Sequence, residues 1–175
     1  MGDDPFEAIV AAHHGEIHRY LVRVTARVSD ADDLSQETFL RAFRAHRALP
    51  PGSNLRAWLF AIATNLFRNH FRGEKRRRLA LAAASAEAPV VDGGRPDGAL
   101  LLSEATARID TIVGGLPFKQ RLAFTMRKLH DLDYAVIGAS LECSAESARA
   151  HVFQALRKIR RELNDSAIVH TEPKR

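Results

Sequence analysis

The 175-residue sequence has a single cysteine, Cys143, so it can form no internal disulfide, and no Cys/His set has zinc-finger spacing. It lacks any run near the ~18 apolar residues of a membrane span. The start, Met1-Gly2-Asp3-Asp4-Pro5, has no signal-peptide character, and no lipidation signal is present. We therefore expect a fold held together by packing, no membrane insertion, and a reducing compartment, the cytoplasm.

Signals of catalysis are also missing. The sequence has no nucleophile motif, no glycine-rich phosphate loop and no paired-carboxylate site. His14 and His18 lie one helical turn apart with His13 adjacent, but no third and fourth ligand accompany them. Cys143 has no base beside it in the sequence. We expect no catalytic residues, no cofactor, no bound metal and therefore no enzyme.

The charge and the apolar content indicate instead a folded protein that binds a polyanionic partner. Lysine and arginine number 26 against 21 acidic residues, a formal net charge of +5. The sequence pI is about 9.9, which favours a polyanionic partner. Apolar residues make up 46% of the chain, enough for a packed core.

The apolar residues recur at spacings of three and four, which predicts an all-α fold. A first helix is expected from Pro5, with Asp4 as its cap, and a second from near Ser29-Asp30, with Phe39 and Phe43 on one side. The segment 49–54 (LPPGSN) ends that helix. A third helix is expected from about Leu55, and its main apolar face comprises Leu55, Trp58, Leu59, Ile62 and Leu66.

The composition then changes. Residues 79–99 are rich in alanine, glycine and proline, which predicts a flexible linker between two small helical domains, 4–78 and 100–164, before a tail at 165–175. The second half is expected to form one helix through Leu101 and Ile112, another from Phe118, and a short helix capped by Asp133. A longer final helix follows a tight turn, and this pair is typical of a helix-turn-helix.

Two surfaces carry candidate nucleic-acid contacts. On the final helix, the period of 3.6 residues turns Ala150, Gln154 and Arg157 outward, flanked by Arg149, His151 and Phe153, an arrangement that fits a major groove. On the third helix, Phe60, Phe67 and Phe71 lead into the basic run Arg68–Arg78, a combination suited to phosphates and base stacking. A solvated amphipathic face and an aromatic core stripe remain the alternative interpretations.

Three segments resemble a known family, the extracytoplasmic-function group of bacterial RNA polymerase sigma factors. They are residues 32–42 (DDLSQETFLRA), residues 56–65 (RAWLFAIATN) leading to Phe71-Arg72, and the stretch from Leu116-Pro117 and Arg121 through the helix-turn-helix to Leu163. The resemblance implies that domain 4–78 binds core RNA polymerase and opens the −10 promoter element. Domain 100–164 is implied to read the −35 element.

The resemblance also implies site residues and partners. The implied partner is core RNA polymerase, through the clamp helices of its largest subunit and through its β subunit. Contacts of domain 4–78 with core polymerase fall to Asp32, Asp33, Gln36, Glu37, Leu40 and Arg44. Contacts with −10 DNA fall to Ser53, Asn54, Asn65, Arg68, Asn69, Arg72, Lys75 and Arg76. Contacts with −35 DNA fall to Arg149, Ala150, His151, Phe153, Gln154 and Arg157. An anti-sigma factor is a further implied partner.

The sequence departs from the family pattern at three positions. Asn69 stands where many members have Asp, Val136 where Glu is common, and Glu142 where a glycine usually makes the turn. A glycine there often serves a positive φ, which Glu adopts only at a cost. Two other functions remain open: a helix-turn-helix regulator that acts without polymerase, and a helical adaptor that binds only protein.

Overall fold

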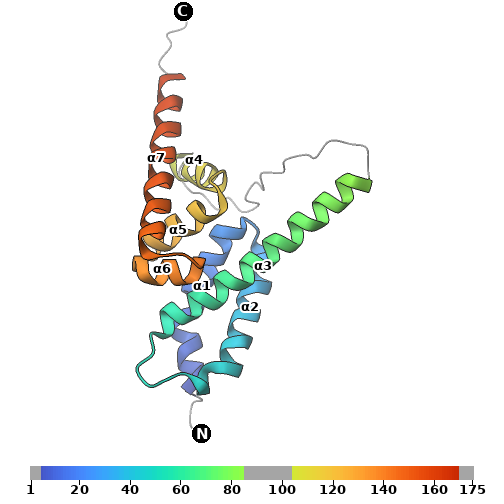
Figure 1. The fold of residues 1–175 in the computed structure, drawn as a ribbon, viewed down its shortest axis with the longest axis vertical. Helices are drawn as coiled ribbons and strands as arrows, with labels where there is room; N and C mark the ends of the chain where they lie inside the picture. The colour runs from blue at the N-terminus through green and yellow to red at the C-terminus, as the bar shows by residue number, and fades with distance from the viewer. Residues whose placement is uncertain (1–4, 85–103, 170–175) are drawn as a thin grey trace, which may run out of the picture. The chain divides into compact units, whose positions relative to one another are not determined.

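The computed structural model describes residues 5–84 and 104–169, and the described chain is helical with short connections and no strand. It divides into two compact units, Met1–Asp97 and Gly98–Arg175, and the division falls inside the predicted linker. Each unit is described by itself (Figure 1). The predicted all-α class is confirmed. Among the described residues, no helix is long and apolar enough to cross a membrane.

The first unit is a bundle of three helices, α1 (Pro5–Thr25), α2 (Val28–Ala45) and α3 (Leu55–Ala84), with a 3-10 turn, η1 (His46–Ala48), after α2. Its core combines Ile17, Tyr20 and Leu21 of α1 with Phe39 of α2 and Phe60 of α3, all buried. The buried Tyr20 hydroxyl lies 2.9 Å from Thr64 Oγ1, so its polar tip has a partner inside the bundle. Arg56 donates to Glu16 at 3.0 Å and joins α3 to α1.

The buried face of α3 differs from the predicted one. Phe60 and Phe67 are 0% and 2% exposed, whereas Trp58 is only half-buried. The observed face is therefore turned by about one residue, or about 100°, from the predicted stripe. Both faces are apolar in sequence, and packing against α1 and α2 decides between them. The base-stacking hypothesis is wrong for Phe60 and Phe67, because neither ring reaches solvent.

Two features of α2 also depart from expectation. The helix begins at Val28, and its cap residue, Arg27, makes no side-chain capping hydrogen bond. Phe43, expected on the apolar side with Phe39, is 47% exposed. Its ring still packs edge-on against buried Phe6 of α1, with centroids 5.3 Å apart.

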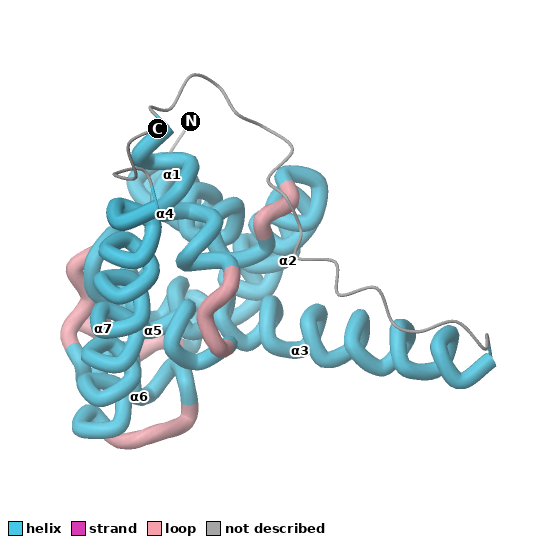
Figure 2. Tube along the Cα trace, turned by 90° about the horizontal axis from the view of Figure 1, so that it is seen from above, coloured by secondary structure: helices cyan, strands magenta, loops and turns pink. Residues whose placement is uncertain are grey.

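Helix α3 continues past the predicted domain boundary at residue 78. It runs to Ala84, so the first six residues of the predicted linker are helical and the rest lie outside the described residues. Leucine and alanine at positions 79–84 are strong helix formers, which explains the extension. From Lys75 to Leu81 every residue is exposed, and Figure 2 shows this half of α3 extending beyond α1 and α2.

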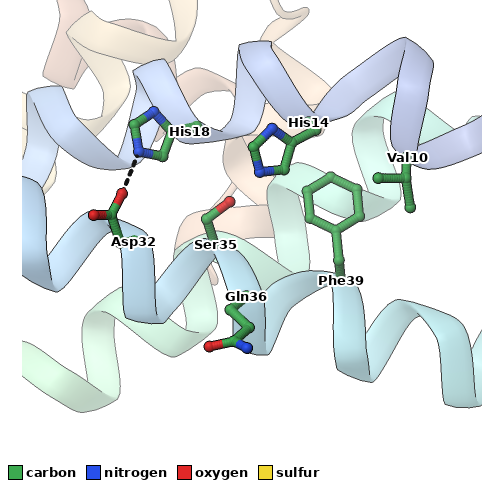
Figure 3. A pocket seen from close by; sticks show the side chains of 7 residues that line it. All are labelled: Val10, His14, His18, Asp32, Ser35, Gln36 and Phe39. Atoms are coloured by element: carbon green, nitrogen blue, oxygen red, sulfur yellow. Dashed lines mark hydrogen bonds and ion pairs between the residues drawn. The ribbon is translucent and has the colours of Figure 1, made fainter.

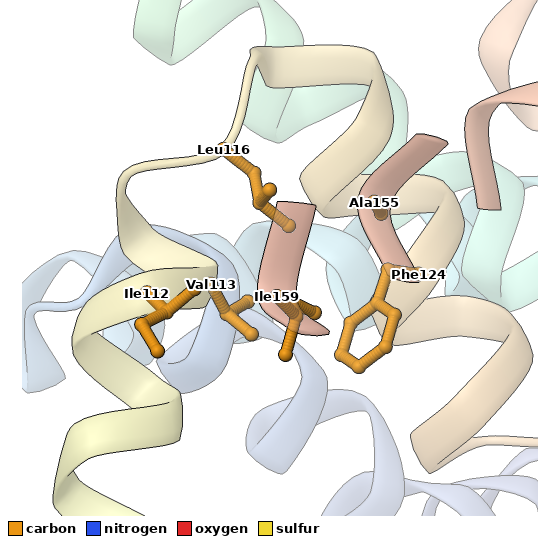
Figure 4. Close-up of a cluster of buried hydrophobic side chains, with 6 residues drawn as sticks. All are labelled: Ile112, Val113, Leu116, Phe124, Ala155 and Ile159. Atoms are coloured by element: carbon orange, nitrogen blue, oxygen red, sulfur yellow. The ribbon is translucent and has the colours of Figure 1, made fainter. Parts of the chain in front are cut away.

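The second unit contains α4 (Glu104–Gly114), α5 (Phe118–Leu129), α6 (Tyr134–Leu141) and α7 (Ala145–Val169). Leu101, expected in the first of these helices, lies outside the described residues. Helix α7 extends five residues into the predicted tail, since no proline or glycine interrupts it before Pro173. Figure 4 shows part of the core, where Ile112, Val113 and Leu116 meet Phe124 of α5 and Ala155 and Ile159 of α7.

The predicted helix-turn-helix is formed by α6 and α7. Asp133 is the N-terminal cap residue of α6, as expected by position, but its side chain makes no capping hydrogen bond. Glu142 ends α6 in the left-handed conformation, with φ +53°, the strained geometry that its place in the turn predicted. A Cβ at Gly138 would lie 2.7 Å from the Cys143 carbonyl oxygen, so only glycine lets the turn fold back this closely.

Candidate nucleic-acid interface

The outer face of α2 presents the predicted polymerase contacts together. Asp32, Asp33, Gln36, Leu40 and Arg44 are exposed and Glu37 is half-buried, and we call these six residues the α2 surface. Leu34, Ser35, Thr38, Phe39 and Ala42, which alternate with them along the helix, are buried, so the helical repeat separates the two sets. Leu40 is 42% exposed at the centre of this polar surface. Polar residues around one exposed leucine are typical of a protein-binding face.

Two carboxylates of the α2 surface already have partners. Asp32 Oδ1 lies 2.7 Å from His18 Nε2 of α1, and Glu37 Oε1 accepts from Arg41 Nε at 2.6 Å. Within the described part of the chain, Asp33 and Arg44 form no ion pair. Asp33 and Arg44 are therefore the charges of this surface most available to a partner.

An open depression of about 480 Å³ lies between α1 and α2 and includes part of the α2 surface. His14, His18 and Val10 line one side, and Asp32, Ser35, Gln36 and Phe39 line the other (Figure 3). The imidazole rings of His14 and His18 stack with centroids 6.0 Å apart. The two rings thus pack on each other and on α2.

The exposed side of α3 gathers most of the predicted −10 contacts. Asn65, Asn69, Arg72 and Arg76 follow each other at helical spacings of four, three and four residues, and all are exposed. Lys75 is exposed beside them. We call these five residues the α3 stripe. Its arginines and asparagines lie opposite buried Phe60 and Phe67, so the stripe faces solvent for its whole length.

Arg68 does not share the α3 stripe. It is 7% exposed, and its guanidinium donates to Asn65 Oδ1 at 3.3 Å. In the helical repeat, Arg68 lies at the border between the buried and the exposed face of α3, and its side chain is buried. The prediction of a direct DNA contact by Arg68 is therefore not supported, and its contact with Asn65 gives it a place behind the stripe.

The predicted loop residues Ser53 and Asn54 are both partly engaged with the backbone. Ser53 Oγ donates to the Pro50 carbonyl at 2.6 Å. Asn54 Oδ1 accepts from the Ala57 amide at 2.9 Å, so Asn54 caps the start of α3. The sequence signal for this cap, an asparagine directly before an apolar periodic run, was present and sequence reasoning did not use it. The Asn54 side chain remains exposed.

On α7 the predicted outward face is exposed as the helical repeat requires. Arg149, Ala150, Phe153, Gln154 and Arg157 are exposed and His151 is half-buried; these six residues are the α7 face. Phe153 is 63% exposed, which is unusual for a phenylalanine in a small helical unit. The buried side of α7, with Ala148, Val152 and Ala155, holds this face at a fixed rotation.

Two positioning contacts on the second unit were missed by sequence reasoning. The Arg149 guanidinium lies over the Tyr134 ring, 5.1 Å from its centroid, and Arg127 lies 5.2 Å from the same ring. Gln120 Nε2 donates to Gln154 Oε1 at 2.8 Å, so α5 orients an amide of the α7 face. Neither contact has a local signal, because the partners are far apart in sequence.

Two titratable groups on α7 have shifted pKa values. The pKa of Glu146 is lowered, first by a backbone hydrogen bond at the helix start and then by the Ser144 hydroxyl. The pKa of His151 is lowered because burial disfavours its charged form, and Lys119 adds repulsion. His151 Nδ1 is buried and makes no hydrogen bond. The α7 face thus carries a neutral imidazole at neutral pH.

Each of the two units matches a known family model. Residues 9–77 match the family model of sigma-70 region 2, and residues 106–159 match that of sigma-70 region 4. Together the two matches span more than two thirds of the chain, in chain order. The chain belongs to the sigma-70 family, in its extracytoplasmic-function group. All residues of the α2 surface and of the α3 stripe lie within the region 2 match, and all residues of the α7 face lie within the region 4 match.

Curated relatives agree with this membership. The chain is 27% identical to the RNA polymerase sigma-H factor of Pseudomonas aeruginosa, over 86% of this chain and 81% of that protein. It is 29% identical to the ECF RNA polymerase sigma-E factor of Escherichia coli, over 78% of each chain.

Solved structures show the same fold. The sigma factor RpoE of Bartonella quintana, crystallised with the anti-sigma factor NepR, matches with a TM-score of 0.75 at 21% identity, over 91% of this chain and 96% of that one. CnrH, solved with the cytosolic domain of CnrY, matches with a TM-score of 0.66 at 22% identity, over 91% and 88%.

Proposed function

We propose that this sigma factor binds core RNA polymerase through the α2 surface and brings the enzyme to promoters by contacting DNA at two separate elements. The α3 stripe contacts the −10 element and the α7 face reads the −35 element. The observation that carries the proposal is that two family regions match in chain order, and that each contains exposed residues which the sequence predicts as promoter contacts.

The chemistry of the two DNA faces supports a division of labour. The α3 stripe offers arginine and lysine to phosphates and asparagine to base edges along one solvent-facing line. The α7 face adds Arg149 for a guanine edge, Gln154 for an adenine, and exposed Phe153 for a thymine methyl group. Duplex opening costs a few kcal/mol per unstacked step, which preferential binding of the separated strand offsets without a catalytic site.

Control by an anti-sigma factor is part of the proposal. Two sigma factors of the same fold, RpoE of Bartonella quintana and CnrH, were solved with NepR and with the cytosolic domain of CnrY. We propose that this chain is held inactive by a partner of the same kind, and that it acts in the cytoplasm, where core polymerase and DNA are.

Reconstituted transcription tests the proposal. Purified chain and core polymerase are combined on a library of randomised promoters, and run-off products are sequenced. We expect products from a subset of promoters with two shared elements, and none from core enzyme alone. A footprint of the chain alone as a dimer would favour a polymerase-independent regulator. Failure to bind DNA with or without core enzyme at moderate salt would favour a protein-only adaptor.

A further inference from the structure

Three metal-ligating side chains converge where α3 leaves the bundle. His70 and Glu74 lie one turn apart on α3, and Asp30 lies in the first turn of α2. One ligand atom from each lies within 4.8 Å of the others, and all three side chains are half-buried. The cluster is separate from the α2 surface, the α3 stripe and the α7 face.

The distances within the cluster are too long for hydrogen bonds and suit a shared ion. His70 Nε2 lies 3.5 Å from Asp30 Oδ2 and 3.9 Å from Glu74 Oε2. Tetrahedral zinc with bonds of about 2.1 Å holds neighbouring ligand atoms about 3.4 Å apart. Small adjustments of two side chains would therefore place all three atoms around one ion.

The His70 nitrogen gives an independent indication. His70 Nε2 has no accessible surface and makes no hydrogen bond, although it faces two carboxylates. Buried nitrogen atoms without a partner are rare and need an explanation. A divalent cation would satisfy this nitrogen and both carboxylate oxygens at once.

Arg27 completes the surroundings of the cluster. Its Nη1 lies 3.7 Å from Glu74 Oε1 and 3.9 Å from Asp30 Oδ2. At Glu74 the oxygen facing Arg27, Oε1, is not the one that faces His70, so the arginine can orient this carboxylate from outside, whereas Asp30 Oδ2 faces both Arg27 and His70. Such partners fix ligand geometry in metal sites.

We propose that Asp30, His70 and Glu74 form a site for a divalent transition-metal ion of the zinc type, with its fourth position open to water. One nitrogen and two carboxylate oxygens are a ligand set that zinc accepts. The bound ion ties the first turn of α2 to α3 at the residue where the exposed basic half of α3 begins.

Cobalt titration of the full chain tests the site, because four-coordinate Co²⁺ absorbs visible light strongly. The protein carries no affinity tag and has Cys143→Ser, which removes the single thiol. We expect the absorption to saturate at one Co²⁺ per chain, to disappear on addition of Zn²⁺, and to accompany a rise in Tm.

Three variants decide which residues bind. His70→Gln should abolish the absorption and the rise in Tm, and Glu74→Gln should weaken Co²⁺ binding at least about tenfold. Glu74→Gln keeps the size and shape of the half-buried side chain, so this variant carries the test if His70→Gln does not fold. The matched control is His18→Gln, because His18 also faces a carboxylate, Asp32 at 2.7 Å, and it should bind as the parent does.

Two results would overturn the proposal. The first is absence of stoichiometric Co²⁺ binding, which would make the cluster an ion-pair network of Arg27 and His70 with the two carboxylates. The second is binding that survives both His70→Gln and Glu74→Gln, or that is lost in His18→Gln instead.

Discussion

The Arg149 guanidinium lies over the ring of Tyr134, with 5.1 Å between the guanidinium carbon and the ring centroid. The contact joins the first helix of the helix-turn-helix to the side chain with the best geometry for a guanine edge. Arg127 covers the same ring and is itself held by Asp131 at 3.0 Å. Tyr134 therefore orients the Arg149 side chain in the free protein.

Removing the ring should weaken −35 recognition without touching a base contact. We expect Tyr134→Leu to lower promoter affinity of the holoenzyme about two- to fivefold, the worth of one exposed cation–π contact. Tyr134→Phe keeps the ring and should bind nearly as the parent does. Equal losses in both variants would show that the hydroxyl group, and not the stacked ring, matters.

Arg149 itself should matter more. Arg149→Ala should cost about 1–3 kcal/mol in binding of the holoenzyme to its promoter, the usual worth of one good base contact. Affinity for core polymerase should not change. An equal loss on DNA with a scrambled −35 element would make Arg149 a phosphate contact.

Charge reversal on the α2 surface tests the polymerase face. We expect Asp33→Lys with Glu37→Lys to weaken association with core polymerase at least about tenfold, because like charges across an interface cost several kcal/mol. Circular dichroism should show an unchanged helical fold. Glu162→Lys on α7, a single charge reversal of the same kind, is the control, and it should keep full affinity. Undiminished affinity in the double variant would move the contact to another face.

A glycine in the turn of the helix-turn-helix should stabilise the second unit. Glu142 has φ +53°, a conformation that costs an L-residue about 1–2 kcal/mol. Glu142→Gly should stabilise α6 and α7 by about 1 kcal/mol after the entropy of the unfolded glycine is subtracted. Ala139→Gly, within α6, should destabilise them by a similar amount. Amide hydrogen exchange of the two helices measures both effects, and faster exchange in Glu142→Gly would contradict the first.

The lowered pKa of His151 predicts a pH dependence of stability. A histidine whose pKa is lower in the folded than in the unfolded state binds fewer protons when folded. Its contribution to stability is present above about pH 6.5 and is lost as the pH falls below that value. Urea unfolding at pH 7.5 and 5.5 should show a smaller loss for His151→Gln than for the parent. Identical losses would mean that the His151 pKa is not shifted.

The sequence predicted much of this architecture, and its failures have physical causes. Periodicity gave the helices and the outward direction of Arg149 and Phe153, because one face of each helix is clearly polar. On α3 two neighbouring faces are both apolar, so only packing could show that Phe60 is buried and Trp58 is not fully buried. Alanine at positions 80 and 82–84 fits either a linker or a helix, and that boundary was misplaced.

Site residues divide in the same way. The residues of the α3 stripe, which the resemblance implied as −10 contacts, are exposed, and their contact with DNA stays a prediction. Arg68, on the border between faces, is buried instead. Tyr134 and Gln120 act across the unit on residues far along the chain, and the Asp30, His70 and Glu74 cluster joins two helices. Spacing within one segment carries no information on such contacts.

The exposed half of α3 has a mechanical consequence. It carries four consecutive cations, Lys75, Arg76, Arg77 and Arg78, and the repulsion between Lys75 and Arg78, three residues apart, opposes the helix. If the α3 stripe binds DNA as proposed, each bound phosphate offsets part of this repulsion, so phosphate binding and helix formation should support each other. High salt should stabilise this half of α3 in the free protein and weaken its binding to DNA.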